Sequence, residues 1–511
     1  IMRLLLSLIG LTLLQPVLSQ EPIDALRYSM IGNGGTARAR AIGGAVTSLG
    51  GDISTAMVNP AGLAFFKTNE FVFTPSLGLN STRTNYLNGD AKSKKTAFDI
   101  NNLGVVMPRD GSMNGNWRNF TFGVGINRSV NFNNQTRLKG TNNESSYSEK
   151  YLEELINNNV TDPNRAATQF PFGSSLALNT YLIDTVSGPG GTVRGYRSLA
   201  TPQTGVIQDQ RVDTKGSLND YFIAASGNFQ DRLYIGGALT FNRLEYERTI
   251  TYRESDATNN KNNNFNYFET VENLLTEGLG VGVKLGLIVR PVQQLRVGFS
   301  YHSPIFYNLD DFYSTSMTTD VEGFQGQGVL KQSSYDLNNG EPGEFQYDYR
   351  TPSRMNVGIS YVFQEVEDVT KQRGFISADA EFINYGKSRF STASTANGVN
   401  YLDELNKAVG EQFRSAVNLR VGGELKFNTL MVRAGYNSLS NAYSNGALKS
   451  AQTNISGGIG YRNKGYIIDL TYVHQLISDV NFPYKLDNGF FAPGTVKGNN
   501  GNVFLTFGMK F

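Results

Sequence analysis

The 511-residue chain has no cysteine, only two histidines and a single tryptophan. The lack of cysteine excludes disulfides, thiol catalysis, iron–sulfur clusters and zinc–thiolate sites, as well as the acylated cysteine of a bacterial lipoprotein. Charge is nearly balanced, with 46 Lys and Arg residues against 44 Asp and Glu residues. This balance gives no support to a nucleic-acid or other strongly charged partner. Any attachment to a membrane must come from the fold itself.

Motifs for catalysis are missing too. The sequence has no Gly-x-Ser-x-Gly and no phosphate-binding loop with Gly-Lys-Ser, so no enzyme is predicted. His302 and His474 lie near the ends of different predicted strands without clustered carboxylates, and solvated rim positions are expected for both rather than a metal site. The Asp310-Asp311 pair offers oxygen ligands for Ca²⁺, but a solvated turn is the simpler interpretation.

No apolar run is long enough for a transmembrane helix, which needs roughly twenty residues. Residues 1–20 instead have the pattern of a secretory signal peptide. Met2 and Arg3 precede an apolar run over 4–14, and small residues stand before a cleavage site near Ser19. Export is therefore expected, and these residues are set aside from the fold.

What the chain does contain is a long series of short segments in which apolar and polar residues alternate, from about Phe71 to Phe511. This period of two indicates β-strands with one apolar face. About fourteen such segments are expected: 70–80, 97–107, 118–129, 218–230, 232–250, 277–290, 293–304, 352–363, 372–384, 414–427, 429–440, 451–463, 465–477 and 501–511. The even number and a mean hydropathy of −0.31 suit an all-β fold, a transmembrane antiparallel β-barrel that is apolar only toward lipid.

The connections between these segments alternate in length. Those after even-numbered segments are mostly short, such as Gln230-Asp231 and Asn428-Thr429, whereas the longest runs over about 130–217. In outer-membrane barrels the short turns face the periplasm and the long loops face outside. The sequence therefore predicts a multi-pass protein of the Gram-negative outer membrane with both termini periplasmic. The long extracellular loops are candidates for contact with a protein partner.

The alternation also predicts which side chains face lipid. Phe120, Phe122 and Val124 would point outward, and Thr121 inward. The inner face also receives the charged residues of the strands, namely Lys284, Arg296, Asp379, Glu381, Arg420, Glu424 and Asp469. A Lys or Arg that faces lipid at mid-membrane costs about 2–4 kcal/mol, so a one-residue shift of register is disfavoured. We expect a polar lumen of mixed sign.

Two features of the strands have more than one interpretation. Gly278, Gly280, Gly282 and Gly286 fall on the inner face of one strand, where they either leave room for another part of the molecule or relieve twist. Pro75 lies inside a strand, although a closed barrel has no free edge for it. A bulge near the start of that strand is the simpler interpretation, and a break in the barrel wall is the alternative.

Residues 21–69 precede the first strand, lack its rhythm and are rich in small and apolar types. As a free periplasmic tail they would expose residues such as Ile42 and Leu49 to water, which is unfavourable. Folding the segment back into the lumen buries these side chains. Three parts are therefore expected: a signal peptide over 1–20, an N-terminal hatch (plug) over 21–69 and a barrel over 70–511.

The run from Gly35 to Leu63, with Asn59-Pro60-Ala61 just ahead of the first strand, resembles the plug of the FadL family. These proteins are outer-membrane transporters of long-chain fatty acids and hydrocarbons. Members have a fourteen-stranded barrel, an N-terminal hatch with an Asn-Pro-Ala motif and a C-terminal Phe, which matches Phe511 here. The resemblance covers essentially the whole mature chain. The very long second extracellular connection departs from better-known members and puts loop-borne ligand contacts in doubt.

This resemblance implies passive uptake of a hydrophobic small molecule. The ligand would enter among the outer loops, reach an apolar pocket against the hatch, and leave sideways through the barrel wall into membrane lipid when the hatch shifts. The resemblance implies hatch or gating roles for Gly43, Gly44, Asp52, Asn59, Pro60 and Ala61. It implies ligand contacts for Met57, Val58, Leu63 and Phe65, and no cofactor.

Two alternatives stay open at this point. Asn59-Pro60-Ala61 is either a moving gate element or a rigid turn that feeds the first strand, because Pro60 holds Asn59 extended in both cases. The protein is either a transporter or a non-transporting barrel of the same kind, serving as a subunit of an outer-membrane secretion or assembly complex. An apolar cavity beside the hatch is expected of a transporter, whereas a scaffold tolerates a filled one.

Overall fold

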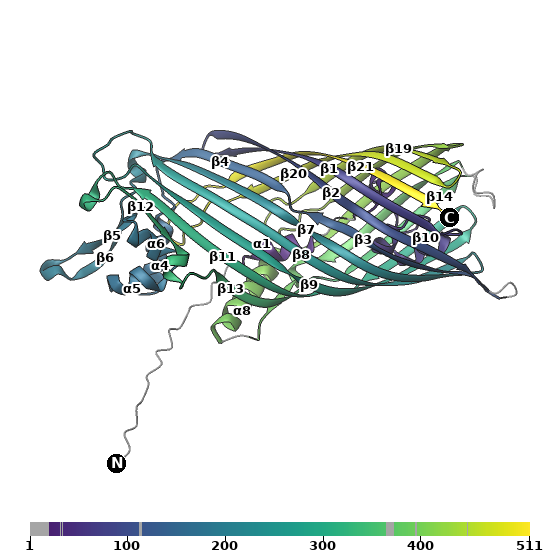
Figure 1. Cartoon of the computed structure of the whole chain (residues 1–511), viewed down its shortest axis with the longest axis horizontal. Helices are drawn as coiled ribbons and strands as arrows, with labels where there is room; N and C mark the ends of the chain where they lie inside the picture. Colours follow the sequence, from purple (N-terminus) through teal and green to yellow (C-terminus); the bar gives the residue numbers. More distant parts are fainter. Residues whose placement is uncertain are drawn as a thin grey trace, which may run out of the picture.

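The computed structural model describes residues 20–30, 32, 34–111, 115–363, 373–393, 396–446 and 448–511. Apart from Gln20, the predicted signal peptide lies outside these residues. The described chain begins with short helices: α1 (Pro22–Ser29), α2 (Ala37–Ala41), α3 (Thr55–Val58) and the 3₁₀ helix η1 (Pro60–Phe65). Antiparallel strands of a closed barrel follow (Figure 1).

The barrel wall is built from the following strands: β1 (Glu70–Tyr86), β2 (Gly89–Asp110), β3 (Trp117–Asn131), β4 (Asn134–Asn142), β7 (Val206–Phe229), β8 (Leu233–Asp256), β9 (Tyr267–Val292), β10 (Leu295–His302), β11 (Phe306–Asp320), β13 (Gly343–Arg350), β14 (Arg354–Phe363), β15 (Gly374–Asn384), β16 (Arg389–Ser391), β17 (Ser415–Phe427), β18 (Leu430–Leu439), β19 (Gln452–Asn463), β20 (Tyr466–Asn481) and β21 (Gly494–Lys510). Four of them continue a preceding one: β4 continues β3, β11 continues β10, β14 continues β13, and β16 continues β15. The wall thus has the fourteen strands that the sequence predicts. The last strand, β21, pairs with β1 and closes the barrel.

The strands are longer than their sequence pattern indicates. β7 and β8 have 24 residues each and β9 has 26, whereas about 9–11 residues suffice to cross a bilayer. The first connection, expected to be long, is a tight turn at Leu87 and Asn88, which both have positive φ. Beyond the membrane neither face of a strand meets lipid, so the apolar alternation fades although the hydrogen-bonded ladder continues.

The predicted facing of the side chains is confirmed. Phe122 is 50% exposed on the outer surface, and Thr121 beside it is buried. The charged residues assigned to the inner face all lie inside, and none is more than 8% exposed. The hydrophobic exterior and the polar lumen therefore follow directly from the period of two.

Pro75 lies at a bulge, as the simpler interpretation has it. The ladder between β1 and β2 runs from Thr74 opposite Asn102 to Pro75 opposite Ile100, so Asn101 is the extra residue. The ladder continues on both sides of this point. The pairing of β2 with its other neighbour, β3, ends next to Asn101, at Asn102.

Smaller elements gather at the end with the long connections (left in Figure 1). They are α4 (Glu149–Asn157), α5 (Pro163–Gln169), α6 (Ser174–Asn179), β5 (Ile183–Ser187), η2 (Pro189–Gly191), β6 (Val193–Ser198), η3 (Pro202–Thr204), η4 (Phe324–Gly326), β12 (Val329–Ser333), α7 (Ser334–Leu337), η5 (Tyr385–Lys387) and α8 (Ala396–Gln412). Those between β4 and β7 form a cap with its own apolar core, which includes Tyr147, Leu155, Leu176 and Phe268. None of the described helices combines the length and the apolarity needed to cross a membrane.

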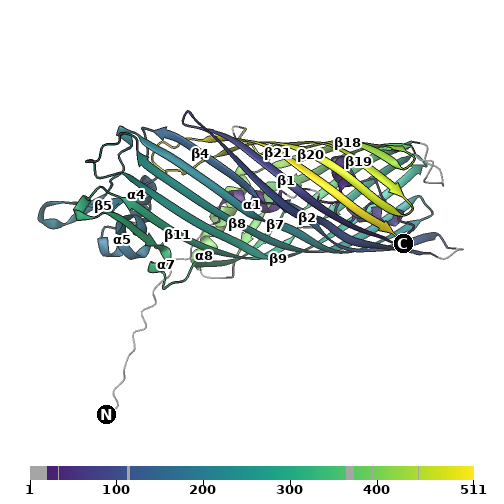
Figure 2. The ribbon, with the colours of Figure 1, turned by 45° about the horizontal axis from the view of Figure 1, so that its top comes forward.

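The hatch segment lies inside the lumen. α1 packs among apolar side chains of the inner wall and of α8, including Tyr28 against Tyr246 and Tyr349. Gln20 donates to the Asp311 carboxylate over 2.7 Å. Phe511, in contrast, lies at the opposite end of the barrel, with the short turns (Figure 2). The sequence predicts that both ends of the chain lie on one side. The two ends of the described chain instead lie apart, because the hatch runs up the lumen.

Candidate functional site

The hatch approaches the barrel wall where the wall has glycines. A Cβ atom placed on Gly236 would lie 2.6 Å from the backbone N of Ala61, and one on Gly458 would lie 2.8 Å from Cβ of Ala41. The glycines whose missing side chains make room for the hatch are Gly104, Gly123, Gly236, Gly286, Gly298, Gly358, Gly422, Gly435 and Gly458. We call them the glycine belt. In the strand whose glycines were noted in the sequence, Gly286 belongs to the belt, whereas Gly280 and Gly282 make room for the barrel's own Tyr307 and Ile305.

Asn59 ties the hatch to the wall through its side-chain amide. Its Nδ2 donates to the carbonyl oxygen of Thr47 within the hatch over 2.6 Å, and to those of Leu287 on β9 and Phe299 on β10 over 3.1 and 3.3 Å. Its Oδ1 accepts from the backbone N–H of Ala61, which starts η1 with Pro60 at its first position. Asn59 is fully buried. The Asn-Pro-Ala motif is thus both a helix start and a clamp on two strands.

The carbonyl groups just before this motif are held by barrel side chains. Lys284 donates to the oxygen of Met57 over 3.0 Å, and Ser300 donates to that of Val58 over 2.7 Å. His302 Nε2 lies 2.8 Å from the same Val58 oxygen. Since α3 ends here, donors are needed for its unpaired carbonyls.

Two expectations about rim residues are wrong. His302 is buried inside the lumen rather than solvated, because it serves the end of α3. Asp311 is buried on β11, where its carboxylate accepts from Thr276 over 2.6 Å as well as from Gln20. No group of three or more potential metal ligands occurs in the described part of the chain.

The other predicted hatch residues shape its turns. The Asp52 carboxylate accepts from the Thr36 hydroxyl over 2.7 Å and from the Ser54 backbone N–H over 2.9 Å, which joins two stretches of the hatch. Gly43 and Gly44 have φ of 66° and 76°, a left-handed conformation that favours glycine. Both border the chamber described below.

The four predicted ligand residues do not converge on one space. Met57 and Leu63 pack in one apolar cluster, and Val58 packs in another. Phe65 stacks on Tyr234 with ring centroids 4.0 Å apart and borders a vestibule of about 660 Å³ on the side of the short turns. Met57 also borders a space of about 30 Å³, roughly the size of one water.

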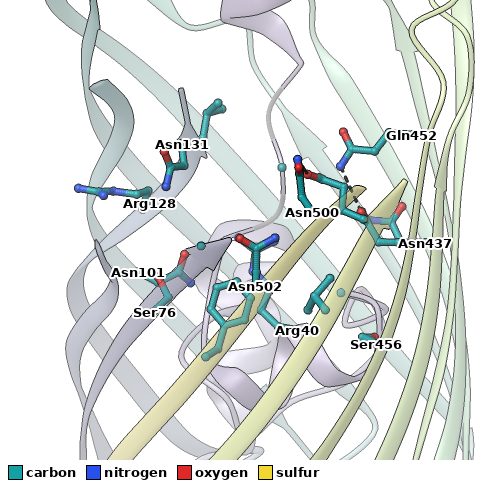
Figure 3. Close-up of a pocket in the computed structure, with 18 of the residues that line it drawn as sticks. Arg40, Ser76, Asn101, Arg128, Asn131, Asn437, Gln452, Ser456, Asn500 and Asn502 are labelled. Atoms are coloured by element: carbon teal, nitrogen blue, oxygen red, sulfur yellow. Dashed lines mark hydrogen bonds between the residues drawn. The ribbon is translucent and has the colours of Figure 1, made fainter. Parts of the chain in front are cut away.

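Another space lies on the side of the hatch opposite the vestibule, and we call it the chamber. Its volume is about 300 Å³, at the lower end of the roughly 300–1,000 Å³ of small-molecule sites. Figure 3 shows side chains from opposite walls converging on it, among them Asn131, Asn437 and Asn500, with Arg40 of the hatch below. The chamber thus has the hatch as its floor and strands from both ends of the chain as its walls.

Beside the chamber the wall has a seam between β2 and β3. Their ladder runs from Asp110 opposite Asn119 to Asn102 opposite Asn127 and goes no further. Beyond it, β2 pairs with β1, whereas the end of β3 and all of β4 pair with β7. We call this unpaired stretch the seam.

The backbone pairing ends here because β4 bends into the lumen and packs behind β1 and β2. The hydroxyl of Thr82, which points inward from β1, donates to the carbonyl oxygen of Gln135 on β4 over 2.7 Å. Lys95 bridges the seam itself by donating to the Thr214 oxygen over 2.6 Å. Near its base, the exposed side chains of Phe98 and Ile100 belong to the apolar outer surface. The base of the seam therefore lies beside the lipid-facing band.

Side chains cross the base of the seam. Asp99 on β2 forms an ion pair with Arg128 on β3 and accepts from Asn131. All three border the chamber. The contacts between the two strands here are made by side chains and not by the backbone, so they can separate without breaking a ladder.

A family model described as outer membrane protein transport protein (OMPP1/FadL/TodX) matches residues 222–484, just over half of the chain. The chain belongs to this family. The crystal structure of a Pseudomonas aeruginosa FadL homologue covers 94% of the chain and 98% of its own length, with a TM-score of 0.57 and 13% identity. That of the P. putida toluene transporter TodX covers 94% and 99%, with a TM-score of 0.50 and 13% identity. No match to the sequence was found among curated proteins.

Membership of this FadL/TodX family confirms several predictions at once. The protein is an outer-membrane barrel of a family of transport proteins, and it is not an enzyme. At 13% identity the likeness to the two solved structures concerns the fold alone. Seam residues Asp99 and Arg128 were missed by the sequence analysis. The Asn101-Asn102 doublet, which breaks the alternation of β2, was the available signal.

Proposed function

We propose that this FadL/TodX-family protein mediates passive uptake of hydrophobic compounds, long-chain fatty acids or hydrocarbons, across the outer membrane. The observation that carries the proposal is the seam, because Asp99, Arg128 and Asn131 at its base border the chamber, and Phe98 and Ile100 beside Asp99 are exposed on the apolar outer surface. A hydrophobic solute that reaches the chamber has a route into lipid there. It need not cross the charged lumen below the hatch.

In this proposal residues 1–20 direct export and 21–69 act as the hatch. Gly43, Gly44, Asp52 and Asn59-Pro60-Ala61 hold the hatch in place until ligand shifts it. The short turns face the periplasm and the cap faces outside. Burial of Ile42 and Leu49 against the wall supports the role of the hatch as a plug.

We further propose that Met57, Val58, Leu63 and Phe65 contact ligand once the hatch has moved. In the resting arrangement the first three are at most 5% exposed. A shift of the hatch away from the wall would uncover apolar surface on both partners. That surface suits the tail of a fatty acid or a hydrocarbon.

The direct test of the proposed exit route is to close the seam with a chemical cross-link. Because the chain has no cysteine, Asp99→Cys with Arg128→Cys introduces the only thiols, which a short bis-methanethiosulfonate reagent can join. The control pair Val105→Cys with Val124→Cys joins residues that are already ladder partners. Uptake of radiolabelled oleate and toluene is measured in cells that lack the wild-type gene.

We expect the cross-linked seam pair to lose uptake and to recover it when the reagent is reduced off. The cross-linked ladder pair should take up solute like the wild type. Unchanged uptake after gene deletion, with a protein that stably co-purifies, would favour the complex-subunit alternative. Loss of uptake by both cross-linked pairs would reject the seam as the exit.

A further inference from the structure

Amides are the commonest side chains in the lining of the chamber, which is unexpected beside an apolar exit. Its wall includes the side chains of Asn80, Asn101, Asn131, Asn133, Asn134, Asn437, Gln452, Asn454, Gln475, Asn500 and Asn502. An amide carries two N–H donors and an acceptor oxygen with two lone pairs. A purely hydrocarbon ligand would satisfy none of these groups, and burying them against it would cost free energy.

The charges around the chamber are largely neutralised within the protein. Arg128 pairs with Asp99, and Arg420 pairs with Glu381 over 3.0 Å. Arg40 of the hatch forms no ion pair among the described residues and stacks on Phe504, with its Cζ 5.1 Å from the ring centroid. The chamber therefore presents many neutral hydrogen-bonding groups and one cation, rather than a cluster of cations.

Several amides are already positioned by their neighbours. Asn500 donates to Gln475 over 3.1 Å and accepts from the Ser81 backbone N–H over 3.1 Å. Gln452 donates to Asn454 over 3.2 Å. These contacts orient the side chains while they leave hydrogen-bonding capacity on each amide.

Other groups at the chamber lack a partner altogether. Asn134 Oδ1, Asn437 Oδ1 and Arg40 Nε are buried without a hydrogen bond. Buried polar atoms are nearly always paired in folded proteins, and an unpaired one costs roughly 1–3 kcal/mol. Rotation of either amide about its last side-chain bond would turn it toward a ligand. Hydroxyl groups, which both donate and accept, suit such a mixed lining better than a carboxylate, which only accepts.

We propose that the chamber binds the neutral, hydroxyl-rich head group of an amphipathic molecule such as an alkyl glycoside. The apolar tail of this ligand lies toward the seam, past Phe98 and Ile100. This inference rests on the proposed function and adds a further substrate class to it, amphiphiles with a sugar-like or polyol head. Asn437 and Asn454 are central to it, because they are ladder partners on β18 and β19 and both border the chamber.

The experiment compares two ligands with the same chain length. Full-length wild-type protein in phosphatidylcholine nanodiscs is titrated calorimetrically with octyl β-glucoside and with sodium octanoate, both below their critical micelle concentrations. Empty nanodiscs provide the blank for partition into lipid. We expect the glucoside to bind at least tenfold more tightly than octanoate. Equal or tighter binding of octanoate would overturn the proposal without the need for any variant.

The variants locate the binding. Asn437→Leu with Asn454→Leu keeps the branched shape and the number of heavy atoms of each side chain but removes two amides, and at least a tenfold loss of glucoside affinity is expected. Asn308→Leu, which removes an exposed amide on β11 far from the chamber lining, is the matched control and should bind like the wild type. Glucoside binding that survives the double substitution would overturn the proposal.

Failure of this inference is distinguishable from failure of the proposed function. If toluene uptake depends on the protein but the glucoside does not bind, the inference alone is wrong. If the glucoside binds as expected but deletion of the gene leaves uptake of every hydrophobic solute unchanged, the proposed uptake of hydrocarbons is wrong.

Discussion

Arg128 on β3 and Asp99 on β2 form an ion pair across the wall just beyond the last backbone pairing of these two strands. The pair is mostly sheltered, with side chains 20% and 9% exposed. On the side of the short turns, β2 and β3 form a hydrogen-bonded ladder from Asp110 to Asn102. On the side of the long connections, the two strands are unpaired and form the seam. The pair therefore stands where backbone pairing between the two strands gives way to contacts between side chains.

Replacing Asp99 with Asn should widen the seam. A sheltered pair of this kind contributes on the order of 1 kcal/mol, so the open fraction should rise about fivefold. Uptake of a fluorescent hydrophobic probe, 1-N-phenylnaphthylamine, measures the change in intact cells. Asp90→Asn is the control, since its pair with Arg83 lies near the turn between β1 and β2, where the two side chains are 50% and 61% exposed. Equal rates for the two variants would show that the pair does not control the seam.

Asn59→Ala should loosen the hatch. The substitution removes the amide from three carbonyl oxygens, those of Thr47, Leu287 and Phe299. Buried groups left unpaired cost roughly 1–3 kcal/mol each, so local opening of the hatch should become at least tenfold more frequent. Hydrogen–deuterium exchange of peptides from the hatch measures this directly. An exposed amide of the cap region, Asn488→Ala, serves as the control, and unchanged hatch exchange in Asn59→Ala would contradict the clamp.

Neighbouring glycines on β8 give a sharper test of the belt. A Cβ on Gly236 would meet the backbone of Ala61 and Pro60, whereas the nearest atom to one on Gly237 is 3.7 Å away. Gly236→Ala should displace the hatch and raise single-channel conductance in planar bilayers. Gly237→Ala should conduct like the wild type. If both variants had the single-channel conductance of the wild type, the position of the hatch would not depend on its close approach to the belt.

The cap should respond to pH through Glu254, which lies on β8 well beyond Phe241 and the apolar band. Burial raises the pKa of its carboxyl to about 6, although Ser146, Tyr252 and Gln208 donate to it. Since the folded cap holds the proton more tightly than an open one, its stability is greatest below about pH 4.5 and falls as pH rises through 6. The total loss is about 2 kcal/mol.

Limited proteolysis of the cap between pH 5 and pH 8 checks this dependence. Cleavage should accelerate with pH in the wild type, after correction for the pH dependence of the protease on a model substrate. Glu254→Gln, which is neutral throughout, should be cleaved at a rate that no longer changes with pH. A wild-type rate that fell with pH would contradict the predicted direction.

The membrane-embedded part of the fold was predictable because lipid imposes a simple rule on each strand. Phe122 outside and Thr121 inside follow from alternation alone, and so does the burial of Arg420 and Glu381. The hatch was predictable because Ile42 and Leu49 needed cover. In each case a single physical requirement acts on residues that are close in sequence.

The seam and the chamber were not predictable in the same way. The seam is a stretch of β2 that has no backbone pairing with β3 or β4. The composition of β2 does not indicate that β4 bends away from it. The chamber brings Asn131, Asn437 and Asn500 together from distant strands, so no local pattern reports it. The ends of β8 and β9 at the long connections were missed because both faces of the strands are polar there. Without an apolar face, the sequence does not alternate with a period of two.

The glycine belt also limits how the hatch can move. Interlocking side chains would have to change rotamer, one after another, before two packed surfaces could pass each other. At Gly236, Gly422 and Gly435 the contact is with the backbone of the hatch. At Gly104, Gly123 and Gly286 the nearest hatch atoms belong instead to the side chains of Ile53, Leu63 and Asn59. Movement of the hatch along the lumen must therefore withdraw these three side chains from the wall, whereas its backbone contacts have no side chains to disengage.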